Sequence, residues 1–132
     1  MKKSLFLLAI AGWVFFSSSA LSAKSQDVDL SGTWVGSTEV PDYPQPDKLV
    51  LVLEKKEGVY QGHFTDEVGY AKETPLRNVV YAENKLSFSF AVFDGMDYQD
   101  IQIMLLVEGE KMTGTWANAE GEGSQVILER KK

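Results

Sequence analysis

The sequence predicts an all-β protein: a single eight-stranded antiparallel up-and-down barrel that follows an N-terminal export signal. Two observations favour strands. Apolar and polar residues alternate with a period of two after Ala23, and no segment shows a convincing helical period. Turn residues also interrupt the alternation at short spacing, as they do in meandering sheets. A third observation, the unequal lengths of the connections, favours a barrel over a sandwich.

Residues 1–23 have the pattern of a signal peptide and are set apart from the domain at residues 24–132. A basic start, Met1-Lys2-Lys3, precedes an uncharged and mostly apolar run at residues 5–16, and small residues follow. The run is shorter than the roughly 20 residues that span a bilayer. Cleavage after Ala23 and cleavage after Ala20 both remain open. The pattern predicts a secreted or periplasmic protein.

Charge and composition narrow the classes of partner. Cleavage after Ala23 would remove two lysines and no acid, which takes the net charge from −6 to −8. Such an acidic chain lacks the basic surface that nucleic acids require. The absence of cysteine excludes disulfides, thiolate metal sites and a cysteine nucleophile. Without disulfides, the stability of the mature chain must come from a well-packed core. We also expect that the mature chain does not insert stably into a membrane.

Eight strands account for the mature chain. The alternation is clearest where Leu86, Phe88 and Phe90 are separated by serines, and it recurs where Ile101, Ile103 and Leu105 would share one face. The strands are expected at residues 30–40, 48–56, 59–65, 76–82, 85–93, 98–107, 111–117 and 124–130.

The connections between these strands differ at the two ends of the meander. Tight turns at residues 57–58, 83–84 and 108–110 would all lie at one end. The connections at residues 41–47, 66–75, 94–97 and 118–123 would lie at the other, and three of these four are long. A barrel with one closed end and one open mouth explains this asymmetry, whereas a Greek-key sandwich does not.

A pattern of apolar residue, hydroxyl residue, Gly, Thr and Trp occurs twice, ending at Trp34 and at Trp116. A looser copy ends at Phe64. Glycine inside a strand marks a bend or a close backbone approach, so Gly32 and Gly114 are expected at barrel corners. The three aromatic side chains would point inward and fill the closed end.

These residues resemble the calycin superfamily, which contains the lipocalins. In lipocalins a Gly-x-Trp on the first strand packs at the closed end beneath a basic residue near the last strand. Gly32, Trp34 and Arg130 match that arrangement, which implies a cation–π contact. The stretch 30–130 is also similar to a small lipocalin-like domain of secreted bacterial proteins, found alone or ahead of an α/β-hydrolase. The chain departs from lipocalins in lacking their disulfide, their second signature and their C-terminal helix.

The sequence contains no recognisable catalytic motif. His63 is the only histidine, and its parity predicts that it faces solvent. No nucleophile elbow, phosphate loop or dinucleotide motif is present. We therefore expect a non-enzymatic protein without a cofactor. Acids at the loop end, among them Asp66, Asp94 and Asp97, form either a solvated rim or a calcium site.

The ligand hypothesis centres on the loop end. Tyr43 lies in a proline-rich loop where lipocalins carry a lid, and Tyr70 and Tyr98 belong to neighbouring loops. With the inward residues Phe90, Ile101 and Ile103, these tyrosines predict a site for one small hydrophobic ligand.

The alternative is a filled barrel that contacts a protein partner or a second copy through its outer face. That face is expected to carry Val50, Val52, Met104, Leu106 and Ile127. An interior void of roughly 300 Å³ or more would favour ligand binding over this alternative.

Overall fold

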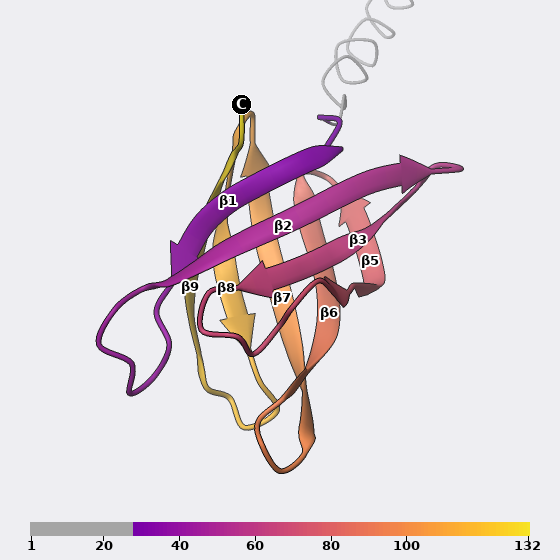
Figure 1. Ribbon diagram of the computed structural model, residues 1–132. Helices are drawn as coiled ribbons and strands as arrows, with labels where there is room; N and C mark the ends of the chain where they lie inside the picture. The colour runs from indigo at the N-terminus through magenta and orange to yellow at the C-terminus, as the bar shows by residue number, and fades with distance from the viewer. Residues whose placement is uncertain (1–27) are drawn as a thin grey trace, which may run out of the picture.

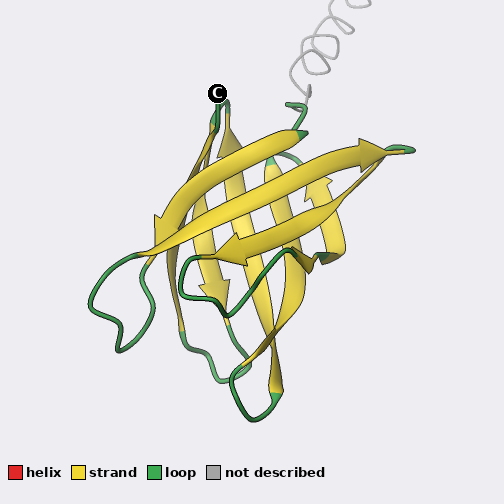
Figure 2. Ribbon diagram, in the orientation of Figure 1, coloured by secondary structure: helices red, strands yellow, loops and turns green. Residues whose placement is uncertain are grey.

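The computed structural model describes residues 28–132, and this part of the chain is all β, with nine strands and no helix (Figures 1 and 2). The predicted signal peptide lies outside the described residues. The strands are β1 (Gly32–Thr38), β2 (Asp47–Lys56), β3 (Val59–Asp66), β4 (Thr74–Pro75), β5 (Arg77–Ala82), β6 (Lys85–Phe93), β7 (Tyr98–Glu108), β8 (Lys111–Ala117) and β9 (Gly123–Arg130). No helix with the length and hydropathy of a membrane span occurs in residues 28–132.

The strands form one antiparallel sheet that curls into a nearly closed up-and-down barrel. Their order is β4-β3-β2-β1-β9-β8-β7-β6-β5, so the first and last long strands pair with each other. The barrel is not fully closed between its two edge strands, β4 and β5. Strand β4 pairs with β3, and β5, which begins after one intervening residue, pairs with β6. In Figure 1, strands β1–β3 cross in front of β6–β9 at a steep angle. Buried side chains from both groups of strands form one core.

The expectation of eight strands is wrong by one short strand. Thr74 and Pro75 pair with Phe64 and His63, inside the segment expected to be a loop. The amide of Leu76 then donates to the carbonyl of Gly62 across 3.0 Å. Proline cannot donate a backbone hydrogen bond, which is why a two-residue strand containing one escapes an alternation pattern. The first strand is shorter than expected, and the other boundaries agree within one or two residues.

The tight turns close one end of the barrel as predicted. Glu57 and Gly58 have φ angles of 52° and 82°, and Glu83 and Asn84 have 54° and 64°. Two consecutive positive φ values define the turn that matches the twist of paired strands. The loops at residues 39–46, 67–73, 94–97 and 118–122 gather at the opposite end, at the bottom of Figure 1.

The tryptophan of β1 fills the closed end. Trp34 is fully buried, and its Nε1 donates to the carbonyl oxygen of Leu30 at 3.0 Å. The guanidinium of Arg130 lies 4.4 Å from the centre of the Trp34 ring and donates to the carbonyls of Ser31 and Asp29 at 2.8 and 2.7 Å. The predicted contact between Arg130 and Trp34 is therefore present.

The prediction that Trp116 and Phe64 also plug the closed end is wrong. Both face the interior, but they line a cavity at the loop end. Trp34 stands two residues into β1, whereas Trp116 and Phe64 stand five residues into β8 and β3. A strand advances about 3.3 Å per residue, so equal motifs at unequal depths reach different levels of the barrel.

His63 also departs from its expectation. It is half-buried rather than exposed, and it pairs with Pro75 of the neighbouring β4. Its Nδ1 is buried without a hydrogen-bond partner. His63 does not line the loop-end cavity.

The outer face carries several exposed apolar side chains. Met104 is 62% exposed, and Leu106 and Ile127 are each 41% exposed. Leu106 and Ile127 are both paired with Thr113 of β8, so they flank one position of the sheet. Val50 and Val52, expected in the same set, are only half-exposed.

Candidate binding pocket at the loop end

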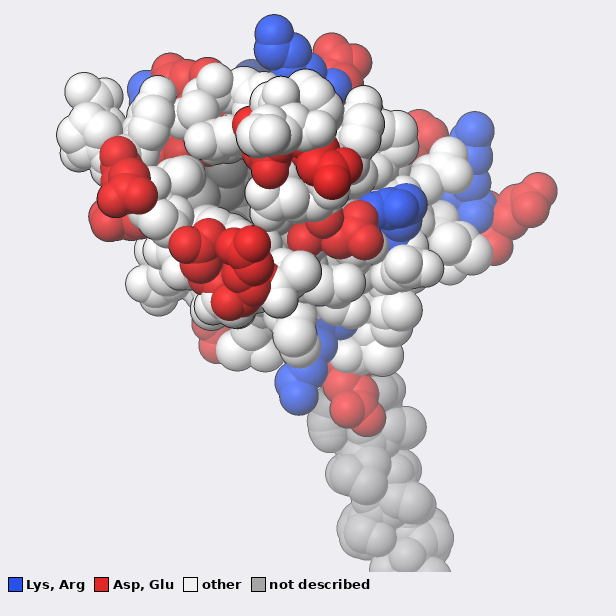
Figure 3. Space-filling model, turned by 90° about the horizontal axis from the view of Figure 1, so that it is seen from below, with Lys and Arg blue, Asp and Glu red and all other residues white. Residues whose placement is uncertain are grey.

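A pocket of about 270 Å³ opens between the loops at the open end of the barrel. Figure 3 views the molecule from that end and shows a hollow surrounded by acidic side chains. The volume lies just below the range of typical small-molecule sites, which begins at about 300 Å³. We call this cavity the loop-end pocket. Its lining comprises Thr38, Val40, Pro41, Asp42, Asp47, Leu49, Phe64, Asp66, Tyr70, Ala71, Phe90, Val92, Asp94, Gln99, Ile101, Ile103, Trp116, Asn118, Glu122 and Val126.

The inner walls of the pocket are aromatic and aliphatic. The rings of Phe64 and Phe90 stack with centroids 4.7 Å apart, and they come from β3 and β6. Trp116 forms another wall, and its Nε1 donates to Thr38 Oγ1 at 3.0 Å. Thr38 Oγ1 in turn donates to the carbonyl of Gln125 at 2.6 Å. The polar atoms of this wall are thus satisfied, which leaves ring surface free for a ligand.

The charged side chains that line the pocket are all acidic. Five of the lining residues are Asp or Glu, and none is Lys, Arg or His. Two of these acids already have internal partners. Asp94 accepts from the amides of Met96 and Asp97 and from Gln99 Nε2, and Glu122 Oε1 accepts from Asn118 Nδ2. These bonds shape the loops and hold the pKa of Asp94 below its usual value, the backbone bond from Asp97 being the largest cause.

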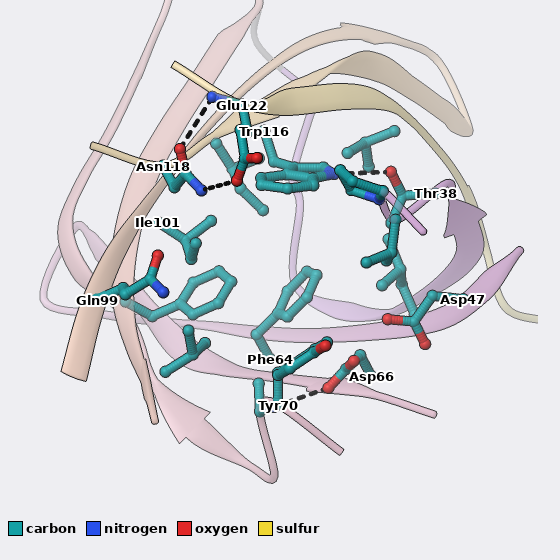
Figure 4. A pocket seen from close by; sticks show the side chains of 18 of the residues that line it. Thr38, Asp47, Phe64, Asp66, Tyr70, Gln99, Ile101, Trp116, Asn118 and Glu122 are labelled. Atoms are coloured by element: carbon teal, nitrogen blue, oxygen red, sulfur yellow. Dashed lines mark hydrogen bonds between the residues drawn. The ribbon is translucent and has the colours of Figure 1, made fainter. Parts of the chain in front are cut away.

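Asp47 and Asp66 form a carboxyl pair on one side of the pocket, as Figure 4 shows. Asp47 begins β2 and Asp66 ends β3, and they occupy diagonal positions on the inward face because Asp66 pairs with Leu49. Asp47 is 2% exposed and Asp66 is 7% exposed. One oxygen of each is bound by a loop amide, Val68 to Asp47 Oδ1 at 3.0 Å and Ala71 to Asp66 Oδ1 at 2.7 Å.

The second oxygen of Asp66 has no such partner. Asp66 Oδ2 is buried and has no hydrogen-bond partner among the amide and hydroxyl groups around it. Burial first, and then a hydrogen bond shared with the carboxyl of Asp66, raises the pKa of Asp47 to about 7. Asp47 therefore holds a proton at a pH where an exposed aspartate would be ionised. The pair is a polar, proton-binding spot in an otherwise apolar wall.

Four of the six residues predicted to bind a ligand meet in this pocket, namely Tyr70, Phe90, Ile101 and Ile103. Tyr43 and Tyr98 do not line it and are 47% and 71% exposed. Tyr98 packs instead against Phe93, with ring centroids 5.1 Å apart. Of the closed-end residues, Gly32, Trp34 and Arg130 lie at the far end of the barrel, whereas Trp116 belongs to the pocket. Gly114 lies against β7, where an added Cβ would meet the carbonyl oxygen of Met104.

The carboxyl pair is the part of the site that sequence reasoning misses. Sequence position alone groups Asp47 with the proline-rich loop, and Asp66 with the acidic loop that follows its strand. The alternation of each strand does indicate where these acids point. Asp47 has the same parity as the inward-facing Leu49 and Leu51, and Asp66 has the same parity as the inward-facing Phe64. An acid at the end of an inward series lies at the mouth of a barrel and on its inner surface.

Within residues 28–132, no group of three or more His, Cys, Asp or Glu side chains is arranged to hold a metal ion. The acids of the 94–100 turn are occupied by turn amides and by a salt bridge from Arg77 to Asp100. The groups that the pocket offers to a ligand include aromatic and aliphatic surface, carboxyl groups and the hydroxyl of Tyr70.

Comparisons with protein-family models, with curated proteins and with solved structures found no match for this chain.

Proposed function

We propose that this protein is an exported, non-enzymatic barrel that binds one small ligand with an apolar body in the loop-end pocket. The observation that carries the proposal is a pocket with apolar inner walls at the one end of the barrel that the hairpins leave open. Its volume of about 270 Å³ is slightly under the expected value of roughly 300 Å³, so the ligand must be small. A barrel of this strand number is just wide enough to be filled by side chains or to hold one small molecule. Here the closed end is filled by Trp34 and the open end is not.

The division between the two ends supports this function. Arg130 seals the closed end, and the strand hairpins there are tight. At the open end, the stacked rings of Phe64 and Phe90 form an apolar floor beneath the loops. Such a floor is poorly hydrated when empty and gains from contact with an apolar body. The export signal expected at residues 1–23 suits a carrier or sensor that meets its ligand outside the cytoplasm.

A pocket-filling substitution tests the proposal. Ile101→Trp should block the pocket, because Ile101 lines it and is only half-buried at the rim. Ile127→Trp is the matched control, with the same change on the exposed outer face. A neutral aralkyl probe, 2-phenylethanol, should cause saturable chemical-shift changes at the Trp116 indole in the parent protein and in Ile127→Trp, but not in Ile101→Trp.

The outer face supports a second candidate function, docking of a protein partner or of a second copy. Met104, Leu106 and Ile127 are exposed side chains on β7 and β9. Under this alternative, 2-phenylethanol would cause no saturable change at Trp116, and the molecular mass by sedimentation would show a dimer that Ile127→Trp weakens. That pair of results would refute the ligand-binding function.

A further inference from the structure

We propose, building on the ligand-binding function above, that the ligand is a small organic cation: an ammonium group on an apolar body. The ammonium would sit against Asp66 Oδ2 and the neighbouring carboxyl of Asp47, and the apolar body would lie on the rings of Phe64, Phe90 and Trp116. Neither an anion nor a wholly neutral hydrocarbon uses the polar side of this pocket.

The first reason is the unpartnered oxygen. Asp66 is 7% exposed, lines the pocket, and has Oδ2 buried with no hydrogen-bond partner. The hydrogen bond that the two carboxyls can share is lost when Asp47 ionises, and an acceptor then left without a donor in a buried place costs free energy. A primary ammonium carries three hydrogen-bond donors and a positive charge. It can donate a hydrogen bond to this oxygen and also neutralise the negative charge of the carboxylate.

The second reason is the pairing of two acids with no base. Asp47 and Asp66 lie side by side in Figure 4, and no Lys, Arg or His lines the pocket to neutralise them. Two buried carboxyl groups this close cannot both ionise cheaply, so one of them retains a proton. A bound ammonium would take the place of that proton as the positive partner.

The third reason is the negative charge at the mouth of the pocket, together with the aromatic surface inside it. Asp42, Asp94 and Glu122 also line the pocket and add negative charge there. Figure 3 shows acidic side chains around the hollow at this end of the molecule. A cleft lined by charges of one sign concentrates ions of the opposite sign. The aromatic rings beneath also favour a cation, since their faces are electron-rich. Charge, hydrogen bonding and aromatic surface thus all select the same ligand class.

A matched pair of probes tests the inference. The body of 2-phenylethylammonium is the same as that of 2-phenylethanol, but the ammonium brings a charge and three donors. We expect the full chain without its export signal to bind the ammonium at least about tenfold more tightly, as measured by calorimetry and by the Trp116 indole shift. An anion with a similar body, 3-phenylpropanoate, should not bind measurably.

Two variants locate the preference. Asp66→Asn and Asp47→Asn each keep a side-chain oxygen for the loop amide that now binds the carboxylate. Each should reduce the preference for the ammonium by about tenfold while leaving the affinity for 2-phenylethanol within a factor of about three. Glu108→Gln is the control, because it removes one charge at the exposed hairpin end of β7.

The parent protein supplies an independent arm. The carboxyl of Asp47 shares the pocket with five other titratable groups, those of Asp42, Asp66, Tyr70, Asp94 and Glu122. The probe 2-phenylethylammonium stays protonated throughout the range. Its affinity should therefore rise several-fold from about pH 5 to about pH 8 as Asp47 ionises, with uptake of ligand coupled to release of a proton.

The outcomes separate the two proposals. Equal binding of the ammonium and the alcohol would overturn this inference and leave the ligand-binding function standing. A preference that survives in both Asp66→Asn and Asp47→Asn would also overturn it. Absence of binding for all three probes would overturn the ligand-binding function, and this inference with it.

Discussion

At the scale of single residues, Asp47 ties folding to pH. Its pKa in the folded chain is about 7 against an ordinary value of 3.8, so the folded state holds a proton that the unfolded state has released. The contribution of this protonated carboxyl to the free energy of unfolding is fully present below about pH 4. It is lost as the pH rises toward 7. Asp94 affects stability over a different pH range. Its pKa is lowered in the folded chain, so its contribution to stability is lost only when the pH falls below the ordinary pKa of an aspartate.

The free energy of unfolding should therefore decrease between about pH 4 and pH 7, by on the order of 2–4 kcal/mol. Asp47→Asn should flatten this dependence, because the amide does not titrate and still accepts from the amide of Val68. Urea unfolding at a series of pH values measures the slope, with Glu108→Gln as the charge control. An unchanged slope in Asp47→Asn would assign the dependence to another group.

Arg130 is the second residue whose contribution can be measured directly. Its guanidinium covers the Trp34 ring and donates to two backbone carbonyls of the chain that enters β1. Arg130→Met keeps much of the aliphatic packing and removes these interactions, so we expect a loss of about 2 kcal/mol in the free energy of unfolding. Arg130→Lys should lose less, since the charge remains near the ring.

Chemical denaturation of Arg130→Met, Arg130→Lys and a control, Lys132→Met, checks this expectation. Lys132 is exposed at the end of the described chain, and its replacement makes the same change in charge. A loss in Arg130→Met no larger than in Lys132→Met would show that the interactions of the guanidinium with Trp34, the two carbonyls and Glu110 together contribute nothing net.

At the scale of elements, alternation and turn chemistry make most strands predictable from sequence. Residues 85–93 illustrate this, since Leu86, Phe88 and Phe90 are buried as their parity indicates. Parity gives the face of a strand but not the height along the barrel, which is why the motif alone places Trp116 at the wrong end. It also fails for β4, where two residues and a proline leave no pattern to detect.

Glycines within strands set the close approach of neighbours. A Cβ on Gly114 would lie 1.8 Å from the carbonyl oxygen of Met104, far inside contact distance and against backbone that cannot easily move. Gly114→Ala should therefore destabilise the β7–β8 pairing by more than about 3 kcal/mol, or prevent folding. Gly109 differs, since a Cβ added there would have no atom within 4 Å, and its φ of 66° is tolerated by asparagine.

Thermal unfolding of Gly114→Ala and Gly109→Asn makes the comparison. The turn variant should stay within about 1 kcal/mol of the parent protein. Comparable stability of the two variants would mean that β7 and β8 separate locally at little cost, contrary to the close packing of the two strands.

At the scale of the whole molecule, the sequence predicts the topology better than the site. The hairpins at one end and long loops at the other follow from turn residues, and they determine where a barrel opens. The pocket depends on which inward positions bulky side chains leave unfilled, a packing outcome that no local pattern encodes. The carboxyl pair depends on both strand register and parity at strand ends. Asp47 and Asp66 are 19 positions apart in sequence and meet only through the β2–β3 register.

The acidic character of the whole chain bears on the proposed ammonium ligand, because attraction that acts through solvent is weakened by salt. Acids at the mouth such as Asp42 and Glu122 act through solvent and are screened within about 10 Å at an ionic strength of roughly 0.1 M, whereas the buried pair acts at contact and is screened much less. The affinity for 2-phenylethylammonium should therefore fall several-fold between about 0.02 M and 0.5 M sodium chloride and then level off.

Calorimetric titration measures this salt dependence, and 2-phenylethanol is the control probe, because salt should not reduce its affinity. A Glu122→Gln variant should show a shallower salt dependence and the same affinity in high salt, whereas Asp66→Asn should bind weakly at every salt concentration. An affinity that continues to fall with salt in the parent protein would place the cation at the solvated rim and not against the carboxyl pair.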